Sequence, residues 1–262
     1  MHKNAHKFLI AQISLLTADH RNGNSDLITQ LGRHAWTARM IRAQTIRVPL
    51  HYSDVNAAPC CASTGDEWGM PDLKIAVDLD GVLAEAMVVW CDLYNKRFGG
   101  DLELKDIRAW DVWKLVKITR DQFFTLLDDA WLDWKKMPPT EQHVGKQVKL
   151  LREFGTVDIV TGRSIRTVSL AKEWLKAHAI PYDGFIRTES TLAKINLAYD
   201  VFIDDSPKLM ELIASRSRIL GVLYTRPWNL DAQMSPAVRR VTRWAEVPPI
   251  IRAASTKPYA GF

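Results

Sequence analysis

Short β-branched runs alternate with longer helical patterns from residue 72 to about residue 225, and this alternation most constrains the fold. Each apolar run has the length of a strand, and an amphipathic segment follows it. The runs expected to form strands are 74–80, 156–162, 184–188, 200–205 and 218–225. Strands that alternate with helices predict an α/β protein with a parallel, doubly wound sheet.

Helical patterns fill the intervals between these runs. The segments expected to form helices are 85–99, 141–154, 165–179, 192–198 and 207–215. The stretch from 101 to 139 differs, because it carries four tryptophans among charged residues and closes with two prolines. It predicts a small helical insert rather than a part of the sheet.

Two carboxylates stand where the first apolar run ends. Asp78 and Asp80 are two residues apart, so in extended backbone both side chains address the same side of the strand end. Gly81 then permits a sharp turn. An acidic turn would explain the glycine but not the position of the two carboxylates. Unless they are compensated, they repel and one holds a proton, and a divalent cation between them removes that cost.

Other strand ends add polar groups at the same expected edge, because ligands of such sheets bind beyond the carboxyl ends of the strands. Thr161 offers a hydroxyl, and Gly162 permits close approach of the backbone. Asp204 and Asp205 end another buried run, and Lys194 precedes it. Taken singly, such residues are usually caps or solvated termini. Together they are the parts of a phosphoryl-transfer site with an oxygen-rich position for Mg²⁺.

The segments DLDGV, VTG and IDDSP, with Lys194 before the last, resemble in this order the four motifs of haloacid dehalogenase-like (HAD) phosphohydrolases. The resemblance covers the core from Lys74 to Thr225. Within that superfamily, YNKRFG, the tryptophan-bearing insert, EWLKAHAIPYDGFI, the IDDSP ending and RPWN resemble the 5'(3')-deoxyribonucleotidase type (cytosolic type C). The resemblance implies a Rossmann-like HAD domain at 70–262, with a small helical cap at about 84–139 inserted after the first strand.

The resemblance also implies roles for individual residues. Asp78 would be the nucleophile that forms an aspartyl-phosphate, and Asp80 the general acid and base. Mg²⁺ would be held by Asp78, the backbone carbonyl of Asp80 and Asp204, with Asp205 as an outer or alternate ligand. The phosphate would be bound by Thr161, Gly162 and Lys194.

Several assignments have alternatives at this stage. The role of Lys194 could fall to another nearby lysine, namely Lys172, Lys176 or Lys208. Arg163 either contacts the phosphate or pairs with an acidic neighbour on the surface.

The tryptophan pairs Trp110/Trp113 and Trp131/Trp134 have i, i+3 spacing, which predicts a packed core of the insert. Stacking of one of them on a nucleobase is the alternative. Trp228 is expected to pack.

Residues 1–69 form a separate segment with five of the seven histidines and two of the three cysteines. We expect a poorly ordered extension or a spurious upstream translation, since Met70 stands just before the first strand. Its histidines and cysteines are interpreted as solvated side chains rather than metal ligands. Its apolar run FLIAQISLL is too short to span a membrane. A transit peptide is the alternative, but Asp19 and Asp26 oppose it.

Composition limits the partners. The net charge of +5 is scattered over 262 residues, so no nucleic acid polymer is required. Three cysteines without a disulfide or metal spacing favour the cytoplasm. The resulting hypothesis is a Mg²⁺-dependent phosphatase of nucleoside monophosphates, without a membrane partner and compatible with a homodimer. The alternatives are another small phosphomonoester as substrate, or a non-catalytic binding protein that retained the fold.

Overall fold

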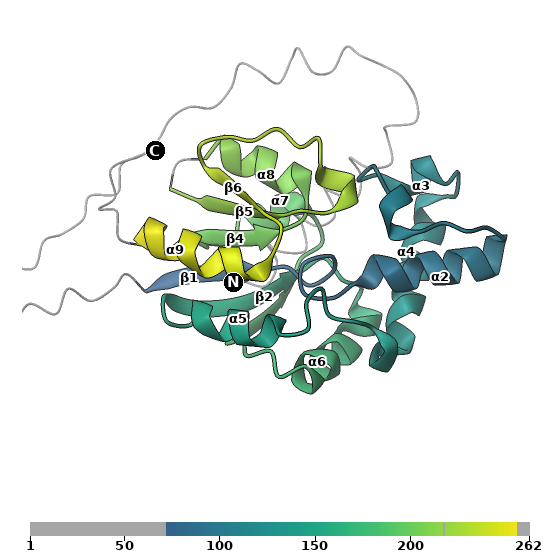
Figure 1. The fold of residues 1–262 in the computed structure, drawn as a ribbon, viewed down its shortest axis with the longest axis horizontal. Coiled ribbons are helices and arrows are strands. Elements are labelled where there is room, and N and C mark those ends of the chain that lie inside the picture. The colour runs from purple at the N-terminus through teal and green to yellow at the C-terminus, as the bar shows by residue number, and fades with distance from the viewer. Residues whose placement is uncertain (1–71, 217, 256–262) are drawn as a thin grey trace, which may run out of the picture. The chain divides into compact units, whose positions relative to one another are not determined.

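The computed structural model describes residues 72–216 and 218–255, so the expectations for residues 1–69 lie outside the described part. Six parallel strands form one sheet in the order β3-β2-β1-β4-β5-β6 (Figure 1). The strands are β1 (Leu73–Val77), β2 (Gly155–Thr161), β3 (Gly184–Arg187), β4 (Val201–Asp204), β5 (Leu220–Tyr224) and β6 (Val238–Val241). This order reverses its direction at β1, which pairs with β2 on one side and β4 on the other.

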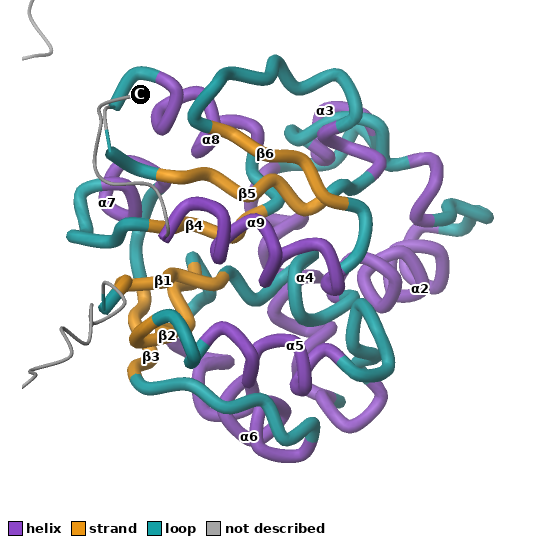
Figure 2. Tube along the Cα trace, turned by 60° about the vertical axis from the view of Figure 1, so that its left-hand side comes forward, coloured by secondary structure: helices purple, strands orange, loops and turns teal. Residues whose placement is uncertain are grey.

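Helices cover both faces of the sheet (Figure 2). They are α5 (Val144–Leu151), α6 (Val168–Ala177), α7 (Thr191–Ile195), α8 (Pro207–Ala214) and α9 (Val247–Ser255). Successive side chains of β1 point to opposite faces of the sheet. Ile75 and Val77 pack with α5, α6 and α9 on one face, whereas Ala76 packs with α7 and α8 on the other. The central strand is therefore apolar on both faces, as parallel sheets require.

A helical insert separates β1 from α5, and its two ends lie side by side. Ala84 pairs with Pro139, and the backbone N–H of Glu85 donates to the carbonyl of Pro138 (2.9 Å). The insert contains α2 (Ala86–Phe98), α3 (Val112–Leu115), α4 (Arg120–Leu132) and the short 3₁₀ turns η3 (Leu104–Asp106) and η4 (Trp134–Lys136). It has its own apolar cluster, built around Trp90 and Phe123.

The predicted α/β fold, with a doubly wound parallel sheet and an insert after the first strand, is confirmed. All five predicted strands form, but the first ends at Val77, so Asp78 and Asp80 lie beyond it. Strand β6 and helix α9 were not predicted. Three further 3₁₀ turns complete the description: η5 (Ile165–Thr167), η6 (Pro227–Asn229) and η7 (Trp244–Glu246).

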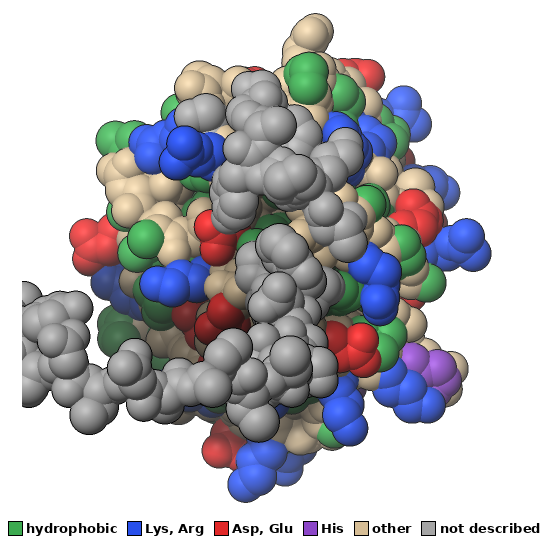
Figure 3. Space-filling view, turned by 90° about the vertical axis from the view of Figure 1, so that its left-hand side faces the viewer, with side chains coloured by type: hydrophobic (Ala, Val, Ile, Leu, Met, Phe, Trp, Pro, Cys, Tyr) green, Lys and Arg blue, Asp and Glu red, His purple; other side chains and the backbone are tan. Residues whose placement is uncertain are grey.

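The surface agrees with the scattered charge of the sequence. On the face seen in Figure 3, basic and acidic side chains are interspersed. None of the helices within the described residues combines the length and apolar character that a bilayer span needs.

Candidate active site

Asp78 lies at the point where the strand order reverses. It directly follows β1, and its backbone N–H donates to the carbonyl of Ile203 in β4 (2.9 Å). The chain then turns at Gly81, whose φ is +80°. A Cβ at that position would lie 2.2 Å from Oδ2 of Asp205, so only glycine lets the two loops approach this closely.

The loop after β4 brings two more carboxylates to the same edge. Asp204 is the last residue of β4, and its Oδ1 accepts the backbone N–H of Ser206 (2.8 Å). Asp205 follows, and its Oδ2 accepts the indole N–H of Trp228 (3.0 Å). Both aspartates are almost completely buried.

Lys194 joins two of these carboxylates. It lies on α7, and its Nζ is 2.7 Å from Oδ1 of Asp78 and 2.7 Å from Oδ2 of Asp204. Two of the alternative lysines have other partners: Lys208, which also lines the cavity, pairs with Asp111 of the insert (3.2 Å), and the ammonium of Lys172 lies over the ring of Phe185. Among the lysines considered from the sequence, it is Lys194 that the structure places against Asp78.

One ammonium does not fully compensate these carboxylates. Burial raises the pKa of Asp78 from 3.8 to about 7, although Lys194 opposes the shift, and Asp204 adds to it. Burial also raises the pKa of Asp205, with Asp204 and Asp78 adding to the effect. For Lys194, burial disfavours the charge, but the charges of Asp204 and Asp78 prevail and raise its pKa. The site therefore has an excess of negative charge.

These carboxylates fit a divalent cation. Asp78, Asp204 and Asp205 each offer one oxygen, and the three atoms lie within 4.8 Å of one another. When ionised, these three carboxylates outweigh the one ammonium of Lys194, and a divalent cation would balance the remaining negative charge. The side chain of Asp80 is outside this group, so its predicted place among the ligands rests on its backbone carbonyl.

The Asp80 side chain points to a different set of partners. Its Oδ1 accepts the indole N–H of Trp131 (2.9 Å), and both carboxylate oxygens accept Nη1 of Arg163 (2.8 and 3.1 Å). Burial raises the pKa of Asp80, and the charge of Arg163 opposes this. Arg163 therefore pairs with acidic neighbours, as one of the two interpretations of the sequence expected, but it does so in the interior rather than on the surface.

Thr161 and Gly162 lie beside the carboxylates. Thr161 ends β2, is buried, and accepts the backbone N–H of Arg163 on its hydroxyl (3.2 Å). Gly162 has open space next to its α-carbon, so a ligand can approach its backbone closely. Both line the same cavity as Asp78, Asp80 and Lys194.

This cavity has a volume of about 500 Å³ and two unlike walls. The sheet edge contributes the polar groups just described. The insert contributes a largely apolar wall that includes Met87, Trp110, Trp113, Phe123, Phe124 and Leu127. The volume falls within the range of about 300–1,000 Å³ typical of small-molecule sites, and the arrangement suits a substrate with an anionic end and an aromatic end.

The two tryptophan pairs of the insert behave differently. Trp131 is fully buried and packs edge-to-face against Trp174 (5.9 Å between centroids), while Trp134 packs against the main core. Trp110 and Trp113 instead line the cavity as well as packing on the core of the insert.

Sequence reasoning missed the polar contacts of two tryptophans. Trp131 and Trp228 were expected to pack, which they do, but each also donates its indole N–H to a site carboxylate, Asp80 and Asp205 respectively. A buried indole N–H usually finds an acceptor, and this general rule is the signal that could have indicated such contacts. Asp128, which contacts Arg163 (3.3 Å), gave no signal in the sequence.

Comparisons with known proteins show a family and a fold for this chain. A family model described as "5' nucleotidase, deoxy (Pyrimidine), cytosolic type C protein" matches residues 72–256. YqfW of Bacillus subtilis, a candidate nucleotidase, is 24% identical over 180 residues, covering 66% of this chain and 91% of YqfW. BH1399 of Halalkalibacterium halodurans, also a candidate nucleotidase, is 25% identical over 187 residues, covering 66% and 89%.

A solved structure shares the fold. The haloacid dehalogenase-like family hydrolase SP0104 of Streptococcus pneumoniae superposes with a TM-score of 0.50 at 16% identity, covering 68% of this chain and 98% of that one. At this level of identity the likeness concerns the fold alone.

Proposed function

Because the chain belongs to the family of cytosolic type C 5' nucleotidases and is a HAD-like phosphatase, we propose that it hydrolyses nucleoside monophosphates with Mg²⁺ and an aspartyl-phosphate intermediate. The observation that carries this proposal is the meeting of Asp78, Lys194 and Asp204 at one sheet edge, with contacts of 2.7 Å. Asp80 and Thr161 line the same cavity.

In the first step, an oxygen of Asp78 attacks phosphorus while the bond from phosphorus to the leaving oxygen breaks. Asp80 gives its proton to that oxygen, and the raised pKa of this buried carboxyl helps it to carry the proton. In the second step Asp80 accepts a proton from water, whose oxygen displaces Asp78 from phosphorus. Both aspartates then return to their starting states, and phosphate is released.

Other residues hold the phosphoryl group in place. The Thr161 hydroxyl and the Gly162 backbone bind its oxygens, and the Lys194 ammonium offsets negative charge between it and Asp78. Asp78, the backbone carbonyl of Asp80 and Asp204 would hold Mg²⁺, with Asp205 beside them. When bound, Mg²⁺ supplies positive charge that stabilises the phosphoryl oxygens.

The Asp78→Asn variant tests the mechanism. We expect it to lose Mg²⁺-dependent hydrolysis of an aryl phosphate by at least ~10³-fold, because the amide cannot act as the nucleophile. Its circular dichroism should match that of the wild type. The control is Asp92→Asn on the exposed side of α2, which should keep full activity. Unchanged turnover in Asp78→Asn would rule out this nucleophile.

A panel of phosphomonoesters tests the substrate class. The aromatic wall around Trp113 and Phe124 offers stacking to a nucleobase, worth about 1–3 kcal/mol per base. We therefore expect kcat/KM for nucleoside monophosphates, deoxy forms included, to exceed that for sugar phosphates by roughly 10-fold or more. A flat or reversed profile would instead favour another small phosphomonoester as substrate.

We also propose that the enzyme acts in the cytoplasm. The cysteine pattern of the sequence favours a reducing compartment, and the matching family is described as cytosolic.

A further inference from the structure

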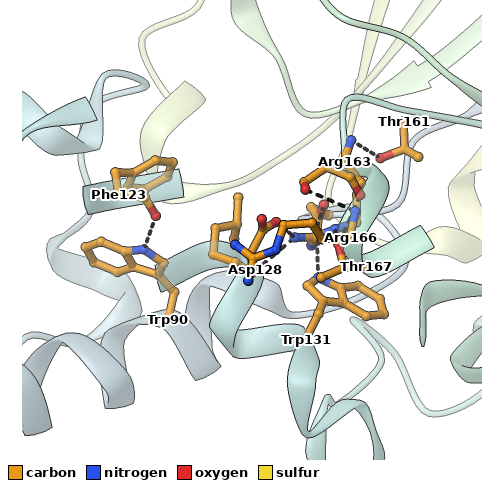
Figure 4. A network of polar contacts seen from close by, with 11 residues as sticks. Trp90, Phe123, Asp128, Trp131, Thr161, Arg163, Arg166 and Thr167 are labelled. Atoms are coloured by element: carbon orange, nitrogen blue, oxygen red, sulfur yellow. Dashed lines mark hydrogen bonds and ion pairs between the residues drawn. The ribbon is translucent and has the colours of Figure 1, made fainter. Parts of the chain in front are cut away.

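Arg163 is a buried arginine, and all three nitrogens of its guanidinium have acceptors. Its side chain is 1% exposed, in the loop after β2. Arginine has five N–H donors in a planar fork. Nη1 donates to both oxygens of Asp80, and Nε donates to Oγ1 of Thr167 (3.0 Å). Nη2 donates to the carbonyl of Leu127 (3.1 Å) and to Oδ1 of Asp128 (3.3 Å) (Figure 4).

These acceptors belong to two different parts of the molecule. Asp80 belongs to the sheet edge, whereas Leu127 and Asp128 belong to α4 of the insert. Trp131 lies about one turn farther along the same helix, donates to Oδ1 of Asp80, and faces the Arg163 guanidinium at 4.8 Å from its ring centroid. Helix α4 therefore holds Asp80 directly through Trp131 and indirectly through Arg163.

The geometry restricts the orientation of the Asp80 carboxylate. Nη1 of Arg163 bridges its two oxygens at 2.8 and 3.1 Å, and the contacts of Nε and Nη2 fix the plane of the guanidinium. Oδ1 receives both Trp131 and the shorter Arg163 contact, so Oδ2 is the less engaged oxygen. Lysine could supply the charge of Arg163 but not this planar geometry.

We propose that Arg163 is a positioning residue that makes the placement of the general acid Asp80 depend on helix α4, with Asp128 and Trp131 as its contacts on that helix. This role rests on the proposed function, because it assumes that Asp80 protonates the leaving group. In this scheme Arg163 contacts neither the phosphoryl group nor the nucleophile, and it acts through Asp80. The docking of helix α4 against the sheet edge then also sets the acid in place.

The chemistry gives this role a specific signature. When the bond between phosphorus and a nucleoside alkoxide breaks, the departing oxygen must receive the Asp80 proton, because an alkoxide is a poor leaving group. Dinitrophenolate leaves as a stable anion without a proton. A misplaced acid therefore slows hydrolysis of a nucleoside monophosphate much more than that of dinitrophenyl phosphate. A general loss of structure would slow both reactions alike.

The experiment compares kcat/KM for these two substrates in the full-length protein with Mg²⁺. Arg163→Lys and Asp128→Asn should each lower kcat/KM for the nucleotide by ~10- to 100-fold, which is a part of what general acid catalysis contributes. The same variants should lower kcat/KM for dinitrophenyl phosphate by less than ~3-fold. Trp131→Phe, which keeps a ring but removes the donor, should shift the ratio in the same direction. The matched control is Asp129→Asn, the next carboxylate on α4, which should leave both values unchanged.

The outcomes separate the two proposals. An active wild type whose Arg163→Lys and Asp128→Asn variants keep the wild-type substrate ratio would overturn the positioning role alone. If Arg163→Lys does not fold, the volume-conserving Asp128→Asn variant decides by the same ratio, with Trp131→Phe as a second variant. A wild type that hydrolyses neither substrate would overturn the proposed function and the positioning role together.

Discussion

At the scale of single residues, the carboxylates of the site are held in place against the cost of their burial, to which their mutual repulsion adds. The raised pKa of Asp78, about 7 compared with 3.8, means that the folded protein binds more protons there than the unfolded chain between those pH values. Stability contributed by this group therefore falls as the pH rises through that window. A bound divalent cation would offset this loss of stability at high pH, because it binds the ionised carboxylates.

This reasoning predicts a pH-dependent effect of Mg²⁺ on thermal stability. At about pH 8, above the raised pKa of Asp78, added Mg²⁺ should increase Tm, whereas at about pH 5 the increase should be much smaller. Comparing Tm with and without Mg²⁺ at each pH cancels the contributions of other titrating groups. Differential scanning calorimetry checks this, with NaCl of equal ionic strength as control. Equal shifts at both pH values would contradict a site built on these carboxylates.

At the scale of elements, the sequence predicted the strands that carry adjacent apolar residues and missed β6, whose two valines are separated by two arginines. β6 has the sequence VRRV, with only its first and last residues buried, and it lies at the edge of the sheet. α9 begins with Val-Pro-Pro, which suggests a loop. Proline is nevertheless tolerated in the first turn of a helix, because the backbone N–H groups there have no acceptor within the helix and proline lacks only that N–H.

The site was predictable where it depends on strand ends and unpredictable where it depends on the insert. Carboxyl ends of neighbouring parallel strands meet at one edge, so Asp78, Thr161 and Asp204 could be grouped from sequence. The contacts of Asp80 depend instead on how α4 docks, and Trp131 lies 51 residues away from it in the chain. No local pattern encodes that docking.

At the scale of the whole molecule, the sheet and insert form the proposed domain at 70–262. The family match begins at residue 72, β1 begins at Leu73, and the site contacts described above lie between Asp78 and Trp228. β1 occupies the centre of the sheet, between β2 and β4, so the domain cannot begin much later. The family match, β1 and these site contacts all lie after residue 69.

A protein that begins at Met70 should therefore fold and turn over substrate as the full-length chain does. We expect its kcat/KM to agree within about twofold and its Tm to be unchanged, because β1 and all residues of the site are retained. The control begins at Asp78 and lacks β1; it should fail to fold, because the central strand supplies Ile75, Ala76 and Val77 to the cores on both faces of the sheet. A large loss of activity or stability in the protein that begins at Met70 would show instead that the preceding residues contribute to the enzyme, and the domain boundary would have to move toward the N-terminus.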